Sequence, residues 1–157
     1  DLIKGLALFS GARRRFEIKG ISRGITVIDD YGHHPTEIKA TLESARIYAQ
    51  SGRVLTVFQP HRYSRTQVFA SEFAKALSAS DYTYLLEIYP ASEKEIPGVS
   101  SLLISKDMES QNHSYQPSMP EVVESVAKMA KSGDLILTLG AGDVSSLGKL
   151  ILEAIES

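Results

Sequence analysis

The stretch Asp29-Asp-Tyr-Gly-His-His-Pro-Thr-Glu37 follows a short apolar run at 25–28 and precedes apolar residues with helical spacing. Two acids, two histidines and a glycine therefore occupy one strand-to-helix turn. In an open α/β sheet, such a turn lies at the carboxyl end of a strand, where ligands bind. Packing alone does not require this composition, so the stretch predicts both a fold class and a binding site.

Strand and helix patterns alternate from this stretch to the end of the sequence. Apolar runs of strand length lie at 25–28, 53–58, 82–88 and 135–139. The segments between them carry helical apolar spacing. The alternation predicts a Rossmann-like, doubly wound α/β domain with a mostly parallel sheet and helices on both faces. The polar turns after the four strands should gather at one edge of the sheet.

Helix starts carry capping signals. Pro35 suits the first turn of a helix, and His34 is a candidate to cap it. Capping boxes are expected at Ser64 with Gln67 and at Ser118 with Glu121.

Three further segments are expected before and between these elements. Apolar spacing over 1–9 predicts a helix, and 13–20 predicts a strand with Phe16 and Ile18 on one face. The Pro- and Gly-containing segment 89–101 is expected to be a solvated connection.

The 157 residues are 43% hydrophobic and 23% charged, which is typical of one globular domain. The absence of cysteine excludes disulfides, thiol catalysis and a thiolate metal site. No run is long and apolar enough to span a membrane, and the N-terminus lacks the layout of a signal peptide. We therefore expect a soluble protein with no membrane partner.

Charge is distributed unevenly along the chain. Residues 1–66 hold 11 Lys and Arg against 6 Asp and Glu, a net of +5, whereas 67–157 hold 6 against 13, a net of −7. All eight arginines lie in the first part, and arginine suits a bidentate grip on carboxylate or phosphate. The basic excess is too small for a nucleic-acid-binding surface, so no nucleic acid partner is expected.

Asp30, at a strand end, suits hydrogen bonds from the vicinal hydroxyls of a ribose; the alternative is a carboxylate that serves only the turn. Adjacent histidines diverge and no third ligand pattern is visible, so His33 and His34 predict no metal site. A hydrogen bond to phosphate or carboxylate suits His33 better, because a helix N-terminus favours anions.

A second polar turn carries His61, Arg62 and Arg65. Two arginines three residues apart at a helix start can converge on one carboxylate; the alternative is a pair of surface arginines. Gly140 and Gly142 permit close backbone approach, as any tight turn does. The chain has no G-x-x-x-x-G-K-[ST] phosphate loop, no G-x-G-x-x-G and no G-x-S-x-G, so it does not carry the usual phosphate cradle itself.

Five motifs, in this order, resemble the C-terminal domain of the Mur ligase family. They are FSGARRRF (9–16), DDYGHHPTE (29–37), FQPHRYSRT (58–66), EIYPASE (87–93) and LGAGD (139–143). The His-His doublet and the HRY-x-RT turn are similar to the alanine-adding branch. A branch that attaches a murein tripeptide to the same sugar nucleotide is the nearest alternative.

The resemblance implies an ATP-dependent ligase that adds L-alanine to UDP-N-acetylmuramate during peptidoglycan synthesis in the bacterial cytoplasm. ATP would phosphorylate the muramate carboxylate, and the alanine amine would attack the acyl phosphate. An N-terminal domain would hold the UDP-sugar, and a central domain would supply the phosphate loop and most of the Mg²⁺ ligands. Residues 1–12 would be the tail of that central domain and 13–157 the C-terminal domain, which we expect to be inactive alone.

The resemblance also implies roles for single residues. Asp30 would bind the ATP ribose, with Tyr31 beside the nucleotide, and His33 would face the reacting centre. The alanine carboxylate would be held by three residues of the second turn, namely His61, Arg62 and Arg65. Two alternatives stay open: a free-standing nucleotide- or anion-binding module, and an interaction protein that docks through 89–101.

Overall fold

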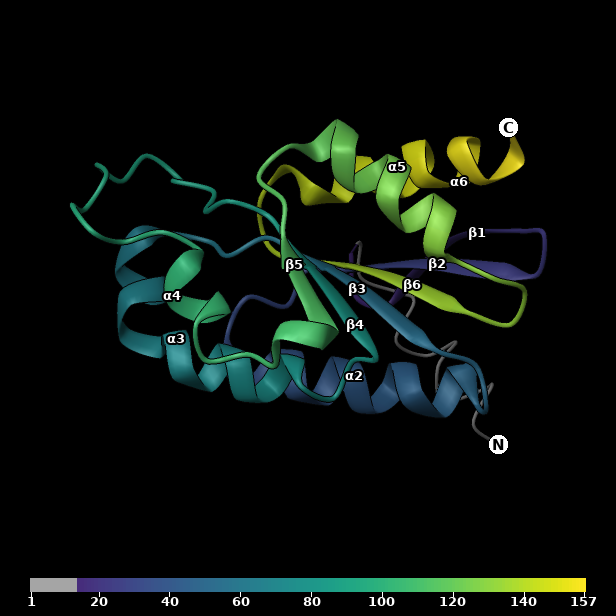
Figure 1. Ribbon diagram of the computed structural model, residues 1–157, viewed down its shortest axis with the longest axis horizontal. Helices are drawn as coiled ribbons and strands as arrows, with labels where there is room; N and C mark the ends of the chain where they lie inside the picture. The colour runs from purple at the N-terminus through teal and green to yellow at the C-terminus, as the bar shows by residue number, and fades with distance from the viewer. Residues whose placement is uncertain (1–13) are drawn as a thin grey trace.

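The computed structural model describes residues 14–157 and shows a six-stranded sheet with helices on both faces (Figure 1). The strands are β1 (Glu17–Ser22), β2 (Ile25–Asp30), β3 (Val54–Phe58), β4 (Tyr82–Leu85), β5 (His113–Tyr115) and β6 (Leu135–Leu139). The helices are α2 (Pro35–Ala49), α3 (Tyr63–Leu77), α4 (Leu102–Ser105), α5 (Met119–Met129) and α6 (Leu147–Glu156), with 3₁₀ turns η1 (Ser110–Asn112) and η2 (Asp143–Ser146). The predicted α/β class is confirmed.

The strand order is β1-β2-β6-β3-β4-β5. Neighbours from β2 to β5 pair in parallel, and only β1 runs antiparallel, to β2. β1 and β2 are joined through Arg23 and Gly24, which both have positive φ (51° and 76°). Such angles suit the tight hairpin turn that joins antiparallel strands.

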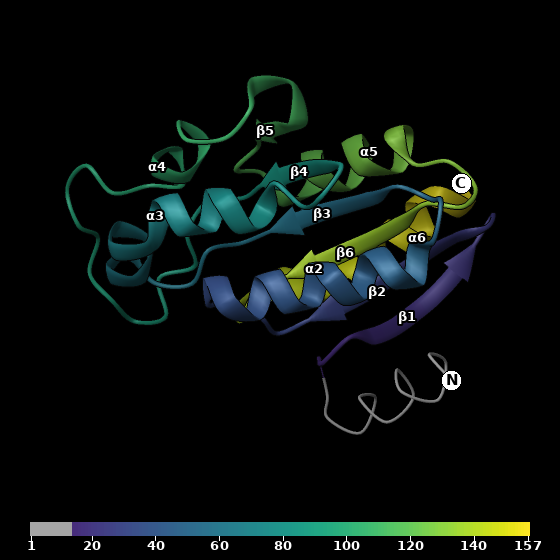
Figure 2. The same cartoon turned by 90° about the horizontal axis from the view of Figure 1, so that it is seen from below.

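Two hydrophobic clusters lie on opposite faces of the sheet. α2, α3 and α4 pack on one face and α5 and α6 on the other (Figure 1), and Figure 2 shows α2 and α3 side by side across the first face. All five residues of β6 are buried. Leu135, Leu137 and Leu139 join the first cluster, and Ile136 joins the second. This alternation is the period of a strand covered on both faces.

The start of α2 confirms His34 as its cap. The His34 Nδ1 accepts a hydrogen bond from the Thr36 amide at 3.2 Å, and the Glu37 carboxylate accepts one from the His34 amide at 3.1 Å. The His34 ring lies edge-on to Phe69, with centroids 4.9 Å apart. The His34 side chain therefore has a structural role, since it caps α2 and packs against Phe69.

The capping box expected at Ser64 is wrong. α3 begins at Tyr63, two residues earlier than a Ser64 cap would place it, and its N-cap residue, Arg62, makes no side-chain cap. The amide and hydroxyl of Ser64 instead donate to the carboxylate of Glu93. The segment 89–101 is therefore tied to the start of α3 by an acid that satisfies helix N–H groups. At α5, Ser118 does cap, accepting from the Glu121 amide at 3.5 Å, but the Glu121 side chain makes no return bond, so the expected capping box is only half formed.

A second correction concerns the strand predicted over 13–20. β1 begins at Glu17, and Ile18 is 51% exposed whereas Phe16 is buried, so the two do not share a face. The backbone of Phe16 has φ 46° and its amide donates to Asp30, which turns its ring toward Tyr48 on α2. The helix expected over 1–9 and the boundary after residue 12 lie outside the described residues.

Candidate nucleotide and amino-acid site

The carboxyl ends of the central parallel strands lie in line. Asp30 pairs with Leu139, which pairs with Phe58, which pairs with Leu85. The polar turns that follow these strands therefore leave from one edge, as the alternation of strands and helices predicted. This edge is the binding edge of an open α/β sheet.

Gln59 joins two of these turns. Its buried side chain donates from Nε2 to the Asp143 carboxylate at 2.8 Å and accepts from the Val144 amide at 3.2 Å. Beside it, a Cβ on Gly142 would lie 2.5 Å from Cγ of Tyr89, so this turn requires glycine. In the sequence, Gln59 appeared only as part of the FQPHRYSRT motif. No local pattern predicts that its side chain joins the turn after β3 to the turn after β6.

Four aromatic rings from three turns, Tyr31, His33, His61 and Tyr89, form a row that we call the ring row. Tyr31 meets His33 edge-on at 5.1 Å, and His33 lies 5.8 Å from His61 between centroids. His61 stacks on Tyr89 at 5.7 Å, with the planes 13° apart. The fold thus brings together His33 and His61, candidates from separate turns.

Arg65 fixes the protonation of His61. Its Nη1 lies 3.1 Å from the His61 Nδ1 and 3.2 Å from the His61 carbonyl oxygen. Guanidinium nitrogens only donate, so Nδ1 accepts and the ring proton sits on Nε2. Burial lowers the pKa of His61, and Arg65 lowers it further. His61 therefore offers a neutral N–H donor.

Arg62 differs from Arg65 in its surroundings. Its backbone has φ 74° and its amide donates to the Tyr89 carbonyl at 2.8 Å. The residue is exposed, and within 14–157 its guanidinium makes no hydrogen bond or ion pair. Both arginines stand at the start of α3, and Arg62 has its donors available to a ligand.

Asp30 is 8% exposed and already accepts three hydrogen bonds. The donors are the amides of Phe16 and Gly32, both at 2.8 Å, and the Thr41 hydroxyl at 3.1 Å. Burial raises the pKa of Asp30 despite these bonds. A carboxylate has about four acceptor sites, so one is left for a hydroxyl. Asp30 is thus part of the turn and still able to accept from a ligand.

An open pocket of about 490 Å³ adjoins Asp30. It combines the apolar surface of Phe16 and Ala40 with the Tyr31 ring, and Arg15 lies in its wall. Tyr31 is 43% exposed. A flat heterocycle with an anionic group fits such a lining, because aromatic and apolar walls accept a base and a guanidinium accepts phosphate.

Comparison with known proteins matches residues 14–142 to the family model described as "Mur ligase, glutamate ligase domain". The chain belongs to the Mur ligase family. It is 44% identical to the UDP-N-acetylmuramate–L-alanine ligase of Rhodococcus erythropolis, a match that covers 100% of the chain and 33% of the relative. The chain thus spans about a third of the length of the curated relatives it matches.

Solved structures agree with this placement in the Mur ligases. The UDP-N-acetylmuramate–alanine ligase of Thermotoga maritima matches with a TM-score of 0.77 and 27% identity, over 98% of this chain and 32% of that one. A domain assigned to a UDP-N-acetylmuramate:L-alanyl-γ-D-glutamyl-diaminopimelate ligase of Haemophilus ducreyi matches with a TM-score of 0.70 and 26% identity, over 90% of this chain and 99% of that one. The second structure is the crystal structure of a domain alone, and almost all of that domain matches this chain.

Residues 14–157 contain neither a cluster of metal ligands nor a membrane-spanning helix. No group of three or more His, Cys, Asp or Glu side chains is arranged to hold a metal ion. Over the same residues, no helix combines the length and apolar character needed to cross a membrane.

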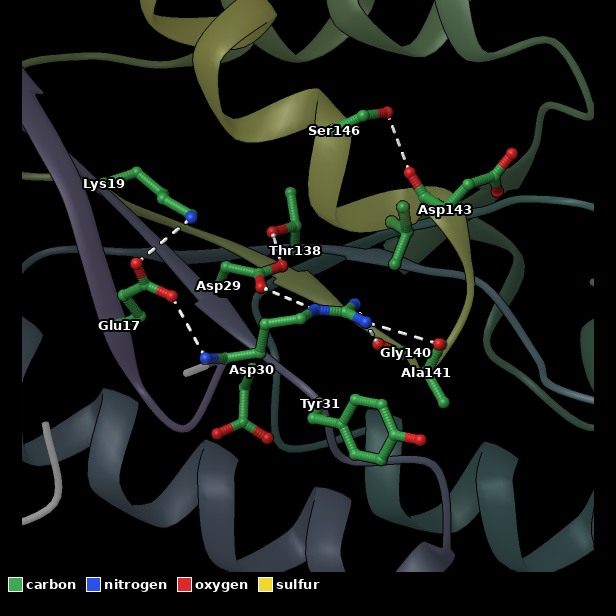
Figure 3. Close-up of polar contacts among 12 residues, drawn as sticks. Glu17, Lys19, Asp29, Asp30, Tyr31, Thr138, Gly140, Ala141, Asp143 and Ser146 are labelled. Carbon is green, nitrogen blue, oxygen red and sulfur yellow. Dashed lines mark hydrogen bonds and ion pairs between the residues drawn. The ribbon is translucent and has the colours of Figure 1, made fainter. Parts of the chain in front are cut away.

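The two acids that open the Mur ligase motif have separate surroundings. Asp29 is fully buried, accepts from the Thr138 hydroxyl at 2.6 Å, and forms an ion pair with the Arg14 Nε at 3.2 Å (Figure 3). Asp30 instead faces Thr41 on α2. Successive strand residues point to opposite faces, so the pair is not a single carboxylate site. In the sequence, Arg14 was marked only as part of the FSGARRRF motif.

The depressed pKa of His61 makes the stability of this Mur ligase domain depend on pH. Its neutral form stabilises the fold fully above the ordinary histidine pKa of 6.5, and this contribution is lost as pH falls below it. The charged groups acting on the ring are Arg65, Arg62 and His33, which lower its pKa, and Glu93, which raises it. The free energy of unfolding of wild-type chain should therefore decline more steeply below that pH than that of His61→Gln.

Urea unfolding of both proteins, from about pH 8 to about pH 5, measures the difference. If the free energy of unfolding changed with pH in the same way in both proteins, the assignment of a neutral His61 would be contradicted.

Proposed function

We propose that this chain is the C-terminal, amino-acid-binding domain of a cytoplasmic bacterial ligase. The complete enzyme would use ATP to join L-alanine to UDP-N-acetylmuramate in peptidoglycan synthesis. One observation carries the proposal: His33 lies beside the His61–Arg65 pair on the binding edge. A proton acceptor and a carboxylate grip are thus adjacent. The identity to alanine-adding relatives supports the choice of amino acid.

The carboxylate of alanine would be held at the start of α3. Arg62 offers unpaired guanidinium donors, Arg65 offers those not directed at His61, and His61 offers its Nε2–H. Such a grip orients a small zwitterion and directs its amine toward the reacting carbonyl. An arginine fork suits a carboxylate better than a lysine does.

His33 is proposed as the residue facing the reaction. Its Nδ1 lies 3.1 Å from the Tyr31 carbonyl oxygen, which only accepts, so the neutral ring carries its proton on Nδ1 and leaves Nε2 as a base. The Glu37 carboxylate, 3.7 Å from Nδ1, would stabilise the imidazolium. As the alanine nitrogen bonds to the acyl carbon, the carbon–oxygen bond to phosphate breaks, and Nε2 can take the proton that the amine loses.

ATP would enter through the pocket beside Asp30 and Tyr31. The remaining acceptor site of Asp30 suits a ribose hydroxyl, and Tyr31 would cover the nucleotide. We assign Mg²⁺ and the phosphate loop to a central domain outside this chain, because the described residues offer no cluster of metal ligands. When bound, Mg²⁺ supplies charge neutralisation on the transferring phosphate.

The test is ligation by the full-length protein that carries this chain. With ATP and UDP-N-acetylmuramate, ADP release should depend on L-alanine, and mass spectrometry should show the amide product. The isolated chain should give none. Turnover with murein tripeptide in place of L-alanine would assign the protein to the other branch, and turnover with neither would refute the proposal.

A free-standing nucleotide-binding module is the second candidate, since the pocket beside Asp30 lies within this chain. Calorimetry with ATP distinguishes the two. Binding by the isolated chain at micromolar ATP favours the module, whereas a site divided between domains predicts weak binding or none.

A further inference from the structure

We infer that Arg14 is a positioning residue for the proposed reaction, one that holds both ends of the ring row without contacting substrate. The inference rests on the proposed function. Arg14 was not among the candidate residues, and it lies just before β1, outside the two polar turns that carry the candidates.

All three nitrogens of the Arg14 guanidinium group are engaged. Nε donates to the Asp29 carboxylate at 3.2 Å, Nη1 to the Ala141 carbonyl at 3.3 Å and Nη2 to the Gly140 carbonyl at 2.6 Å. Asp29 lies on β2, and Gly140 and Ala141 lie in the turn after β6 (Figure 3), so the three bonds join two separate parts of the site. A planar fork with fixed donor directions can make all three bonds, whereas an ammonium cannot.

Asp29 determines where the guanidinium sits. Its carboxylate is fully buried and its other oxygen is taken by the Thr138 hydroxyl at 2.6 Å. A buried carboxylate needs a paired cation, and Arg14 is the one cation that pairs with it among residues 14–157. The Arg14 side chain is therefore held in one orientation.

Tyr31, the first member of the ring row, is held by Arg14 in two ways. The Tyr31 amide donates to the Arg14 carbonyl, and the guanidinium carbon lies 5.1 Å from the centre of the Tyr31 ring. Tyr31 is otherwise an exposed side chain on a turn. The contact restricts its rotamer and, through the edge-on contact, supports His33.

The other end of the row is reached through the turn after β6. Arg14 binds the carbonyls of Gly140 and Ala141, and the next residue, Gly142, packs against the Tyr89 ring. Tyr89 in turn stacks on His61. One guanidinium thus sets the spacing between the Tyr31 side of the site and the Tyr89 side.

Arg53 provides a matched control at the opposite edge of the sheet. It too pairs with a buried acid, Asp134, at 2.6 Å, and donates to a backbone carbonyl, that of Met129, at 2.9 Å. No candidate site residue touches it within the described chain. Loss of Arg53 should therefore report the structural cost of breaking such a pair, without an effect on the site.

The experiment compares Arg14→Gln, Arg14→Lys and Arg53→Gln in the full-length protein. Arg14→Gln should raise the KM for ATP about tenfold and lower kcat about tenfold, changes that correspond to one hydrogen-bonded or cation–π contact each. Arg14→Lys keeps the charge beside Asp29 but not the two carbonyl bonds. Its KM for ATP and its kcat should lie between those of the wild-type protein and those of Arg14→Gln. Arg53→Gln should lower Tm while KM and kcat stay within about twofold. Equal kinetics in the Arg14 and Arg53 variants would overturn the inference.

Two further measurements cover the cases in which kinetics would not decide. If Arg14→Gln does not fold, the double variant Arg14→Gln with Asp29→Asn removes both charges and should show the same rise in KM. If the wild-type protein does not ligate alanine, the proposed function fails, but NMR of tyrosine-labelled protein still tests the positioning. Arg14→Lys should shift and broaden the Tyr31 ring signals and Arg53→Gln should not; unchanged Tyr31 signals would refute it.

Discussion

Arg62→Ala in the full-length protein is expected to raise the KM for L-alanine about 30-fold and to leave the KM for ATP within about twofold. A hydrogen bond to a charged group contributes about 2 kcal/mol, and about 1.4 kcal/mol corresponds to a tenfold change in affinity. The Arg62 guanidinium makes no hydrogen bond or ion pair within the described chain, and the residue is exposed, so its removal takes away ligand contacts and little packing. Steady-state kinetics with each substrate varied in turn measures the split.

Arg23→Ala is a suitable control for this variant. Arg23 is also an exposed arginine with positive φ, 51°, but it lies at the hairpin turn on the opposite edge, where it donates to the Glu156 carbonyl. Its replacement should leave both KM values unchanged. An unaltered alanine KM in Arg62→Ala would remove this residue from the carboxylate site.

Asp30→Ala is expected to raise the KM for ATP at least tenfold and to destabilise the domain by about 3 kcal/mol. The loss of stability follows because the buried amides of Phe16 and Gly32 lose their shared acceptor. The loss of ATP affinity would follow from the ribose contact. If ATP and alanine affinity fell equally, Asp30 would have only a structural role in the turn.

Thr41→Val separates the two effects. It deletes one of the three hydrogen bonds to Asp30 and keeps the carboxylate. We expect it to cost about 1 kcal/mol of unfolding free energy while the KM for ATP changes less than about threefold. Urea unfolding of the chain and kinetics of the full-length protein measure the two quantities. A large rise in ATP KM in this variant would show that turn geometry, not the carboxylate, controls binding.

The sequence predicted the parts of this domain that depend on local periodicity. The alternation of strands and helices, the common binding edge and the His34 cap all follow from residues within a few positions of one another. The meeting of His33 and His61 follows from parallel strands, since the turns after β2 and β3 leave from the same edge of the sheet even though β6 lies between the two strands. Their specific roles stay predictions.

Contacts between distant residues were not predictable. Arg14 reaches the turn at Gly140 across 126 positions, Gln59 reaches Asp143 across 84, and Glu93 caps Ser64 across 29. No local pattern marks the partner of a polar side chain at such separations. Because Glu93 supplies the acceptor that a local capping box would have supplied, α3 begins earlier than the capping pattern indicated.

The antiparallel direction of β1 has a mechanical consequence. Arg14, just before β1, lies on the binding edge, whereas the hairpin turn at Arg23 lies at the other edge. β1 has six residues, so this lever arm is about 20 Å long, and a rotation of about 20° around Arg14 would sweep the hairpin through about 7 Å. The ring row, close to the pivot, would move far less. A fluorophore at residue 23 would therefore be a sensitive reporter of any swing of this domain, placed where it leaves the binding edge untouched.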